Sequence, residues 1–309
     1  MLESSDTDSY DSHVLTGAGI DVLRAYEDAA TAVGRLDASG RLASPGLREL
    51  LVLRCIATPD SASRDRMIAL MHGDGEREDS LRIYATAVRD GAARARGGAL
   101  PSVASLHELL RKPAPPQLSG PLDDLLRDSR ERTPPVLKAA LSAVAIREAP
   151  AASGDEPAIA RLAALAVTLV LCVGGATTDA WLTLPRPRAA ADLSLRGTFA
   201  ALAREARAAE RGLVAARELG DADEQRVRDS LGRAAYSALD VLALLRERIV
   251  LAVPETARVL GQTPPTTGAA MARLVELGIA REVTGKARSR AFAYDGIVGA
   301  LQPDAGTRQ

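Results

Sequence analysis

Residues 254–294 read PETARVLGQTPPTTGAAMARLVELGIAREVTGKARSRAFAY, and the fold prediction starts from this stretch. A short helix is expected over Pro254 to Leu260, followed by a turn at Gly261-Gln262-Thr263. A second helix is expected from Pro265 to Leu277, because prolines suit the first turn of a helix and a glycine follows its end. Residues Arg281 to Tyr294 alternate on both sides of a glycine turn, which predicts a two-stranded hairpin. This order, helix, turn, helix and hairpin, is that of a winged helix-turn-helix.

A winged helix of this kind binds duplex DNA with the start of its second helix in the major groove and its hairpin on the phosphate backbone. The segment from Arg281 to Arg290 has four basic residues against one acid, Glu282, a local net charge of +3. The start of the second helix has no Arg, Asn or Gln to form a bidentate base contact, so we do not expect it to read sequence alone. The candidate DNA-binding residues are Thr263, Thr266, Thr267, Arg273, Lys286, Arg288 and Arg290. A winged helix used only for packing or for protein contact stays an equal alternative.

The composition restricts the class of protein. The chain has 309 residues, with 39 Lys and Arg against 40 Asp and Glu, which excludes a globally basic nucleic-acid coat, so any DNA contact must be local. Aromatic residues make up 3%, so Leu, Ala, Val and Ile must form the core, a composition that suits close-packed helices. The fold class is therefore predicted to be mainly α.

Periodicity and loop composition give a linear domain prediction. The apolar stretch Ala158 to Val173 is expected to be a helix buried in a bundle, followed by two long charged helices from Leu193 to Leu219 and from Glu224 to Val250. No leader peptide and no membrane-spanning stretch is apparent, so we expect a cytoplasmic protein without a membrane partner. The predicted segments are a disordered tail (1–16), an N-terminal helical region (17–111), a helical core opened by a proline-rich linker (112–250), the winged helix (251–302) and a C-terminal tail (303–309).

Residues 256–301, TARVLGQTPPTTGAAMARLVELGIAREVTGKARSRAFAYDGIVGAL, are similar to the C-terminal winged helix of the Fic/Doc family. Shorter stretches, AVGRLDASGRL (32–42), REDSLRIYATAV (77–88) and LPSVASLHELL (100–110), are similar to the family's N-terminal motifs in the same order. The resemblance implies a Fic-like helical bundle with a C-terminal winged helix, and it makes a homodimer possible.

The family's activity depends on a motif that this chain lacks. Active Fic proteins transfer AMP from ATP to a protein hydroxyl with the pattern HPFxDGNGRxxR, in which the His is the general base and the arginines neutralise phosphate charge. Alignment on Arg161 places Pro150 at the His, Glu156 at the Asn and Ala158 at the first Arg. Asp155 and Glu156 would also repel a triphosphate. We therefore expect an inactive Fic-like protein, without cofactor or metal, that regulates by binding DNA or a protein target.

Two alternatives stay open. If the alignment is shifted, a diverged nucleotidyl transferase could use Asp155, Glu156 and Arg161 with ATP and Mg²⁺. Alternatively, the chain is a structural or dimerisation scaffold whose winged helix only packs against the long helices.

Overall fold

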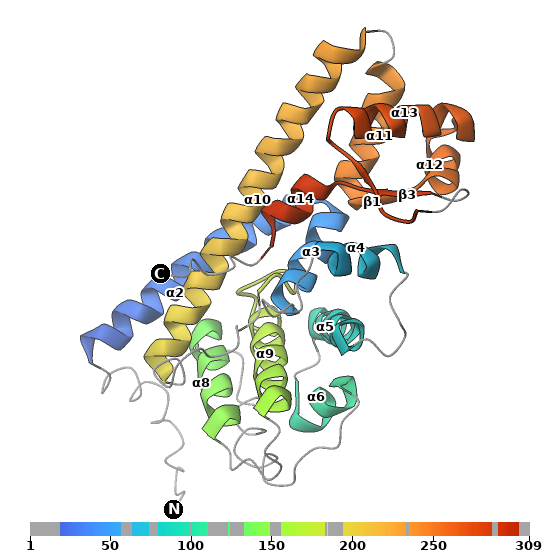
Figure 1. The fold of residues 1–309 in the computed structure, drawn as a ribbon. Coiled ribbons are helices and arrows are strands. Elements are labelled where there is room, and N and C mark those ends of the chain that lie inside the picture. Colours follow the sequence, from blue (N-terminus) through green and yellow to red (C-terminus); the bar gives the residue numbers. More distant parts are fainter. Residues whose placement is uncertain are drawn as a thin grey trace, which may run out of the picture. The chain divides into compact units, whose positions relative to one another are not determined.

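The protein is described from a computed structural model, which covers residues 19–56, 64–73, 80–98, 101–110, 123, 133–148, 156–182, 184, 194–232, 235–285 and 290–302. This part of the chain is mainly helical with one small antiparallel sheet, so the predicted fold class is confirmed at this level (Figure 1). None of its helices is both long enough and apolar enough to cross a bilayer. The helices are α2 (Ile20–Arg41), α3 (Pro45–Ile56), α4 (Arg64–His72), α5 (Ser80–Arg96), α6 (Val103–Leu110), α8 (Pro135–Glu148), α9 (Glu156–Val173), α10 (Leu195–Leu231), α11 (Ala235–Arg248), α12 (Val253–Leu260), α13 (Pro264–Glu276) and α14 (Asp295–Ala300). The strands are β1 (Val250–Ala252), β2 (Arg281–Glu282) and β3 (Ala291–Ala293).

Contacts divide the chain into two compact units that are not consecutive in sequence. The first comprises residues 1–38 and 84–207, and the second comprises residues 39–83 and 208–309. This is a division in space, so the linear boundaries predicted from the sequence stay a prediction. The predicted tails, 1–16 and 303–309, and the proline-rich linker lie outside the described residues.

The first unit is built around α9. Every side chain from Leu162 to Leu171 is buried, and α9 packs mainly against α8. A helix that is apolar on all sides has no solvent face, which is what the sequence predicted for this stretch. Close packing extends to Gly91 of α5, where an added Cβ would lie 2.8 Å from a methyl group of Leu169.

A buried carboxylate holds the loop that follows α9. Oδ1 of Asp37 accepts hydrogen bonds from the backbone N–H and the hydroxyl of Thr178, at 2.5 and 2.6 Å, and from the indole N–H of Trp181 at 2.8 Å. Asp37 is 5% exposed, so these donors replace the water that the charge has lost.

The predicted break between two long helices at residues 219–224 is wrong, because α10 runs unbroken for 37 residues. Gly220 lies inside it rather than ending it. An added Cβ there would lie 2.6 Å from Nε of Arg246 on α11. The guanidinium of Arg246 binds Asp221 and Glu224, which are on α10 like Gly220. The glycine therefore makes room for an arginine of α11. It is not a helix stop.

The second predicted long helix also ends differently. α11 ends at Arg248, and Ile249 has φ +67°, a left-handed conformation that is rare for a β-branched residue. The chain then enters β1, whose first residue, Val250, was predicted to be the last residue of the helix. Gly46 of α3 packs directly on this junction, because an added Cβ would lie 2.7 Å from the carbonyl carbon of Arg248 and from Cγ1 of Ile249.

Candidate functional site

The C-terminal segment contains the helix, turn, helix and hairpin that the sequence predicted. The three strands form an antiparallel sheet in the order β1-β3-β2, with Val250 of β1 and Arg281 of β2 on opposite sides of Ala293. β3 is buried throughout, and α11, α12 and α13 contact one another (Figure 1). Gly261 ends α12 with φ +62°, which a glycine adopts without strain and which allows the turn into α13.

The first four positions of α13 have no backbone N–H left for a ligand. Pro264 and Pro265 occupy its first two positions and lack an N–H. The N–H of Thr266 donates to the hydroxyl of Thr263 at 3.3 Å, and the N–H of Thr267 donates to the carbonyl of Thr263 at 3.0 Å. A helix N-terminus binds phosphate through free N–H groups, so this one offers no such site.

Thr267 was predicted to be exposed at a DNA interface, and this is wrong. Its side chain is 0% exposed, and its hydroxyl donates to Oε1 of Gln262 at 3.3 Å. Thr267 begins the buried side of α13, which continues through Ala270, Met271 and Leu274. It therefore lies on the buried side of α13, and its side chain cannot touch a partner.

The outer face of α13 is small and nearly neutral. Its exposed residues are Pro264, Pro265, Thr266, Ala269, Ala272, Val275 and Glu276, with Gly268 and Arg273 partly exposed. Val275 is 39% exposed, and Val259 at the end of α12 is 40% exposed. These valines, Ala269 and Ala272 are not among the site residues predicted from the sequence. The exposed face could have been recognised from the helical spacing of the sequence, because residues 265, 269, 272 and 276 fall on the side of the helix opposite the buried residues.

One of the four basic residues counted for the hairpin is engaged elsewhere. The guanidinium of Arg281 binds Asp65 at 2.6 Å and Asp295 at 2.9 Å. Its hydrogen bonds raise the pKa of Arg281 above the ordinary value, the bond to Asp295 more than the bond to Asp65. Its contribution to a phosphate-binding surface is therefore largely cancelled. Lys286 and Arg288 lie outside the described residues.

Of the hairpin cations that the structure describes, Arg290 lies beside α13. It is exposed, its guanidinium carbon is 5.6 Å from the centre of the Phe292 ring, and Nη1 is 3.8 Å from Glu282. Nη2 lies 4.0 Å from where a Cβ on Gly268 would stand. The structure thus brings Arg290 next to Gly268 on α13.

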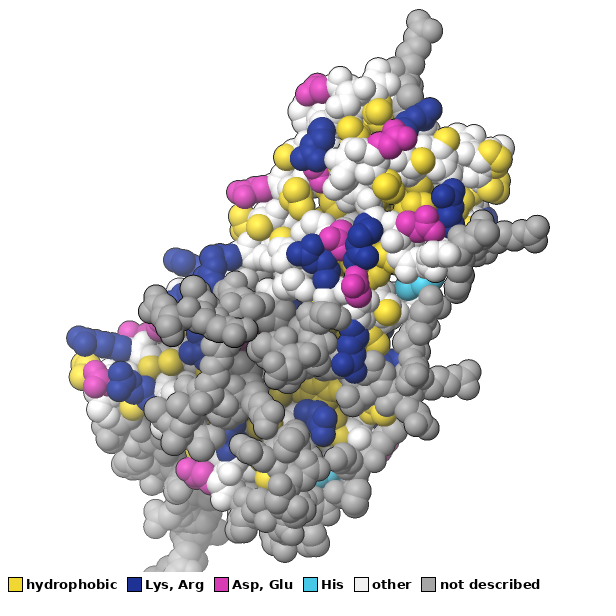
Figure 2. Space-filling view, viewed as in Figure 1, with side chains coloured by type: hydrophobic (Ala, Val, Ile, Leu, Met, Phe, Trp, Pro, Cys, Tyr) yellow, Lys and Arg dark blue, Asp and Glu magenta, His cyan; other side chains and the backbone are white. Residues whose placement is uncertain are grey.

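Over the described residues between 235 and 302, basic and acidic side chains balance. There are six arginines, at 246, 248, 258, 273, 281 and 290, and six acids, at 240, 247, 255, 276, 282 and 295. Arg246, Arg248 and Arg281 are in close ion pairs. Figure 2 shows hydrophobic side chains between single basic and acidic ones over this segment, without a continuous basic area among the coloured residues on the face drawn.

The residues suggested for a nucleotide site are only partly described. Arg161 lies in α9, is half-buried, and its carbonyl oxygen accepts a hydrogen bond from the hydroxyl of Tyr84 at 3.0 Å. Glu156 is the first residue of α9, but its side chain lies outside the described part, as does Asp155. Within the described residues, no three His, Cys, Asp or Glu side chains are grouped to hold a metal ion.

The chain was also compared with known proteins, and neither the family models nor the curated proteins gave a match.

Proposed function

We propose that this chain is a non-enzymatic regulator with a Fic-like helical bundle and a C-terminal winged helix, and that the outer face of α13 binds a partner protein. The observation that carries this proposal is the uncharged, small-residue surface formed by Pro265, Ala269 and Ala272 on a helix whose opposite side is buried.

The winged helix is supported by topology. A strand, β1, precedes the helix pair α12 and α13, and the hairpin that follows places β3 between β1 and β2. These elements follow the order expected of the module, and their buried residues include the central strand and Thr267.

Protein contact is favoured over DNA reading by the chemistry of α13. Base recognition needs bidentate donors and acceptors such as Arg, Asn or Gln, and phosphate binding at a helix start needs free N–H groups. The exposed start of α13 has neither. Small apolar side chains, together with the exposed Val275 on the same helix, instead allow a protein surface to approach closely and exclude water.

The test is photo-crosslinking from the full-length chain in its own cells. A photoreactive amino acid replaces Ala269, and a matched control replaces Ala222, an exposed alanine of α10 between Asp221 and Asp223. We expect a discrete protein adduct from position 269 that is absent from position 222. Adding Ala272→Arg, a change at an exposed position, should abolish the adduct because it places a charge in the centre of the face.

Two outcomes would contradict the proposal: adducts with nucleic acid, or the same set of adducts from both positions. An adduct with a second copy of the chain would identify the partner as the chain itself.

Binding of duplex DNA is the second candidate, and Arg290 beside Gly268 favours it. It is tested by fluorescence anisotropy with a random duplex over a range of salt concentrations. If the hairpin holds phosphates, the affinity falls steeply as the salt concentration rises. Arg290→Ala, or the pair Lys286→Ala and Arg288→Ala, then reduces the slope of log binding constant against log salt concentration by about 0.9 for each phosphate contact that is lost. Arg196→Ala, an exposed arginine at the start of α10, is the control and should change nothing.

The lack of AMP transfer is tested separately. Incubation with labelled ATP and a cell lysate should give no labelled protein band. Label that depends on the chain and disappears with Arg161→Ala would overturn the non-enzymatic assignment and support the diverged transferase.

A further inference from the structure

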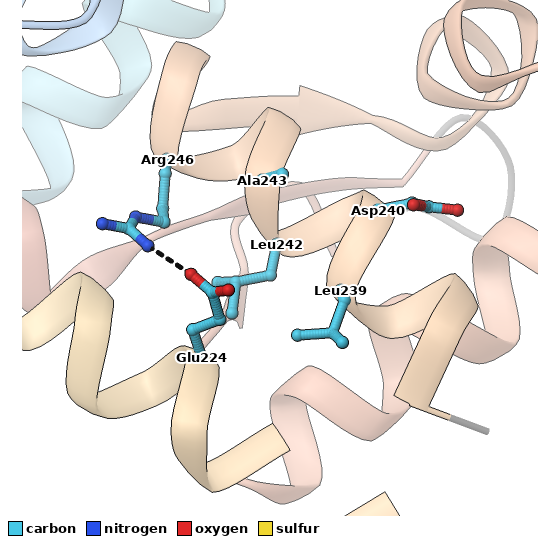
Figure 3. A pocket seen from close by; sticks show the side chains of 6 residues that line it. All are labelled: Glu224, Leu239, Asp240, Leu242, Ala243 and Arg246. Carbon is cyan, nitrogen blue, oxygen red and sulfur yellow. Dashed lines mark hydrogen bonds and ion pairs between the residues drawn. The ribbon is translucent and has the colours of Figure 1, made fainter. Parts of the chain in front are cut away.

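A pocket of about 400 Å³ lies between the end of α10 and α11, in the second unit (Figure 3). Leu239, Leu242 and Ala243 of α11 form its apolar lining. Glu224 of α10 and two charged residues of α11, Asp240 and Arg246, complete it. A volume of this size is at the lower end of what small-molecule sites offer.

The charges around this pocket do not cancel. Oε2 of Glu224 accepts a hydrogen bond from Arg246 at 2.8 Å, and its Oε1 accepts one from Arg228. Arg246 also binds Asp221 at 2.6 Å, so these two acids and two arginines balance one another. Asp240 differs, because its hydrogen bond at 3.3 Å comes from the neutral amide of Gln262. Among the described residues, Asp240 therefore has no cationic partner, and the lining has one negative charge in excess.

That charge is at one end of the apolar lining. In Figure 3 the carboxylate of Asp240 and the Glu224–Arg246 pair are at opposite ends of the labelled group, with Leu239, Leu242 and Ala243 between them. A ligand that fits this arrangement has a cationic group for Asp240 and an aliphatic chain for the leucines. A carboxylate ligand would be repelled by Asp240, and Arg246 is already bound by two carboxylates.

We propose that this pocket is a binding site for a small aliphatic amine, whose ammonium group pairs with Asp240 while its alkyl chain lies on Leu239, Leu242 and Ala243. The site is separate from the outer face of α13, and neither proposal depends on the other.

The probe is hexylammonium, titrated into the full-length, isotope-labelled chain and followed by the NMR shifts of the backbone amides. We expect saturable shifts confined to residues lining the pocket, and weaker binding of hexanol and hexanoate. Asp240→Asn should weaken hexylammonium binding about twofold to fivefold, as expected for loss of one exposed ion pair.

Two further variants make the test specific. Asp229 is a matched control, because it is an exposed carboxylate on α10 that likewise accepts a hydrogen bond from a glutamine amide, that of Gln225. Asp229→Asn should leave the affinity unchanged. Ala243→Leu should abolish binding, since Ala243 is exposed and a larger side chain there fills the pocket without entering the core.

The proposal is overturned if no saturable shifts occur near α11, if hexanol binds as tightly as hexylammonium, or if Asp229→Asn has the same effect as Asp240→Asn.

Discussion

The hydroxyl of Tyr294 donates a 2.6 Å hydrogen bond to Oδ2 of Asp223, and the two side chains are 0% and 2% exposed. The second oxygen of Asp223 is 3.0 Å from Nη2 of Arg226 on the same helix. Tyr294, which directly follows β3, is thus hydrogen-bonded to α10 through the buried carboxylate of Asp223.

Tyr294→Phe should lower the free energy of unfolding by about 1–3 kcal/mol, because it leaves a buried carboxylate oxygen without its donor. Urea denaturation measures the effect. Tyr236→Phe is the matched control, since Tyr236 is 78% exposed, and it should change stability by less than about 0.5 kcal/mol. Equal effects of the two changes would show that the Tyr294 hydrogen bond is not stabilising.

The same pair predicts a stability loss at alkaline pH. Burial, together with the hydrogen bond to Asp223 and its charge, raises the pKa of Tyr294 above the ordinary value. The folded protein therefore keeps a proton that the unfolded chain loses near pH 10. The contribution of Tyr294 to the free energy of unfolding is then complete below about pH 10 and declines as the pH rises further. Unfolding measured at pH 8 and at increasing alkaline pH should show a steeper decline for the wild type than for Tyr294→Phe.

Asp37→Ala should destabilise the chain by about 3 kcal/mol, because three donors around a buried carboxylate lose their acceptor. Trp181 is the single tryptophan of the sequence and one of those donors, so its fluorescence reports the change directly. We expect a red-shifted emission and an earlier urea midpoint. Asp21→Ala, at an exposed position of the same helix, should alter neither.

Replacing a glycine by alanine should have opposite effects at two positions. In Gly46→Ala the new Cβ would lie 2.7 Å from backbone atoms of Glu247 and Arg248, which cannot move aside alone, so a loss of about 2 kcal/mol is expected. Gly34 lies within α2 with no atom within 4 Å of an added Cβ. Gly34→Ala should therefore stabilise the helix by about 0.5–1 kcal/mol. Thermal and urea unfolding of both variants measure the difference, and a stabilising Gly46→Ala would contradict the close approach.

Acidification should weaken the contact between α4 and α14. Burial alone would raise the pKa of Asp295, but hydrogen bonds from Arg281 and Arg64 outweigh it and hold that pKa below the ordinary value. At pH values above about 3.9, the pKa of this carboxyl in the unfolded chain, the Asp295 carboxylate stabilises the fold. This stabilisation is lost as the pH falls through the lower pKa that Asp295 has in the folded protein. The stability difference between wild type and Asp295→Asn, measured from pH 6 downward, should shrink below pH 4. A constant difference would exclude this titration.

The features that the sequence could predict are those written in local patterns. The all-round apolar stretch of α9 had to be buried, and the prolines at 264 and 265, Gly261 and the alternation from 281 to 294 marked helix ends and a hairpin. In each case the determining interaction lies within a few residues along the chain.

The features that were missed depend on distant residues. Gly220 resembles a helix stop until Arg246 is seen to need its space, and β1 forms only because β3 pairs with it. Arg281 counts as a free cation until Asp65, more than two hundred residues earlier, binds it. Thr267 could have been placed correctly, since it lies on the buried side with Ala270, Met271 and Leu274, three to seven residues away.

The two prolines at the start of α13 give its exposed end an unusual chemical character. An anion that reaches this helix end meets the proline ring carbons, and the N–H groups of Thr266 and Thr267 are already donated to Thr263, so the first four positions of the helix offer it no backbone proton. For the partner protein that we propose to bind this face, selectivity then rests on steric fit. Changes of side-chain volume at Ala269 or Ala272, more than changes of charge at the helix start, are therefore the alterations expected to change which protein binds.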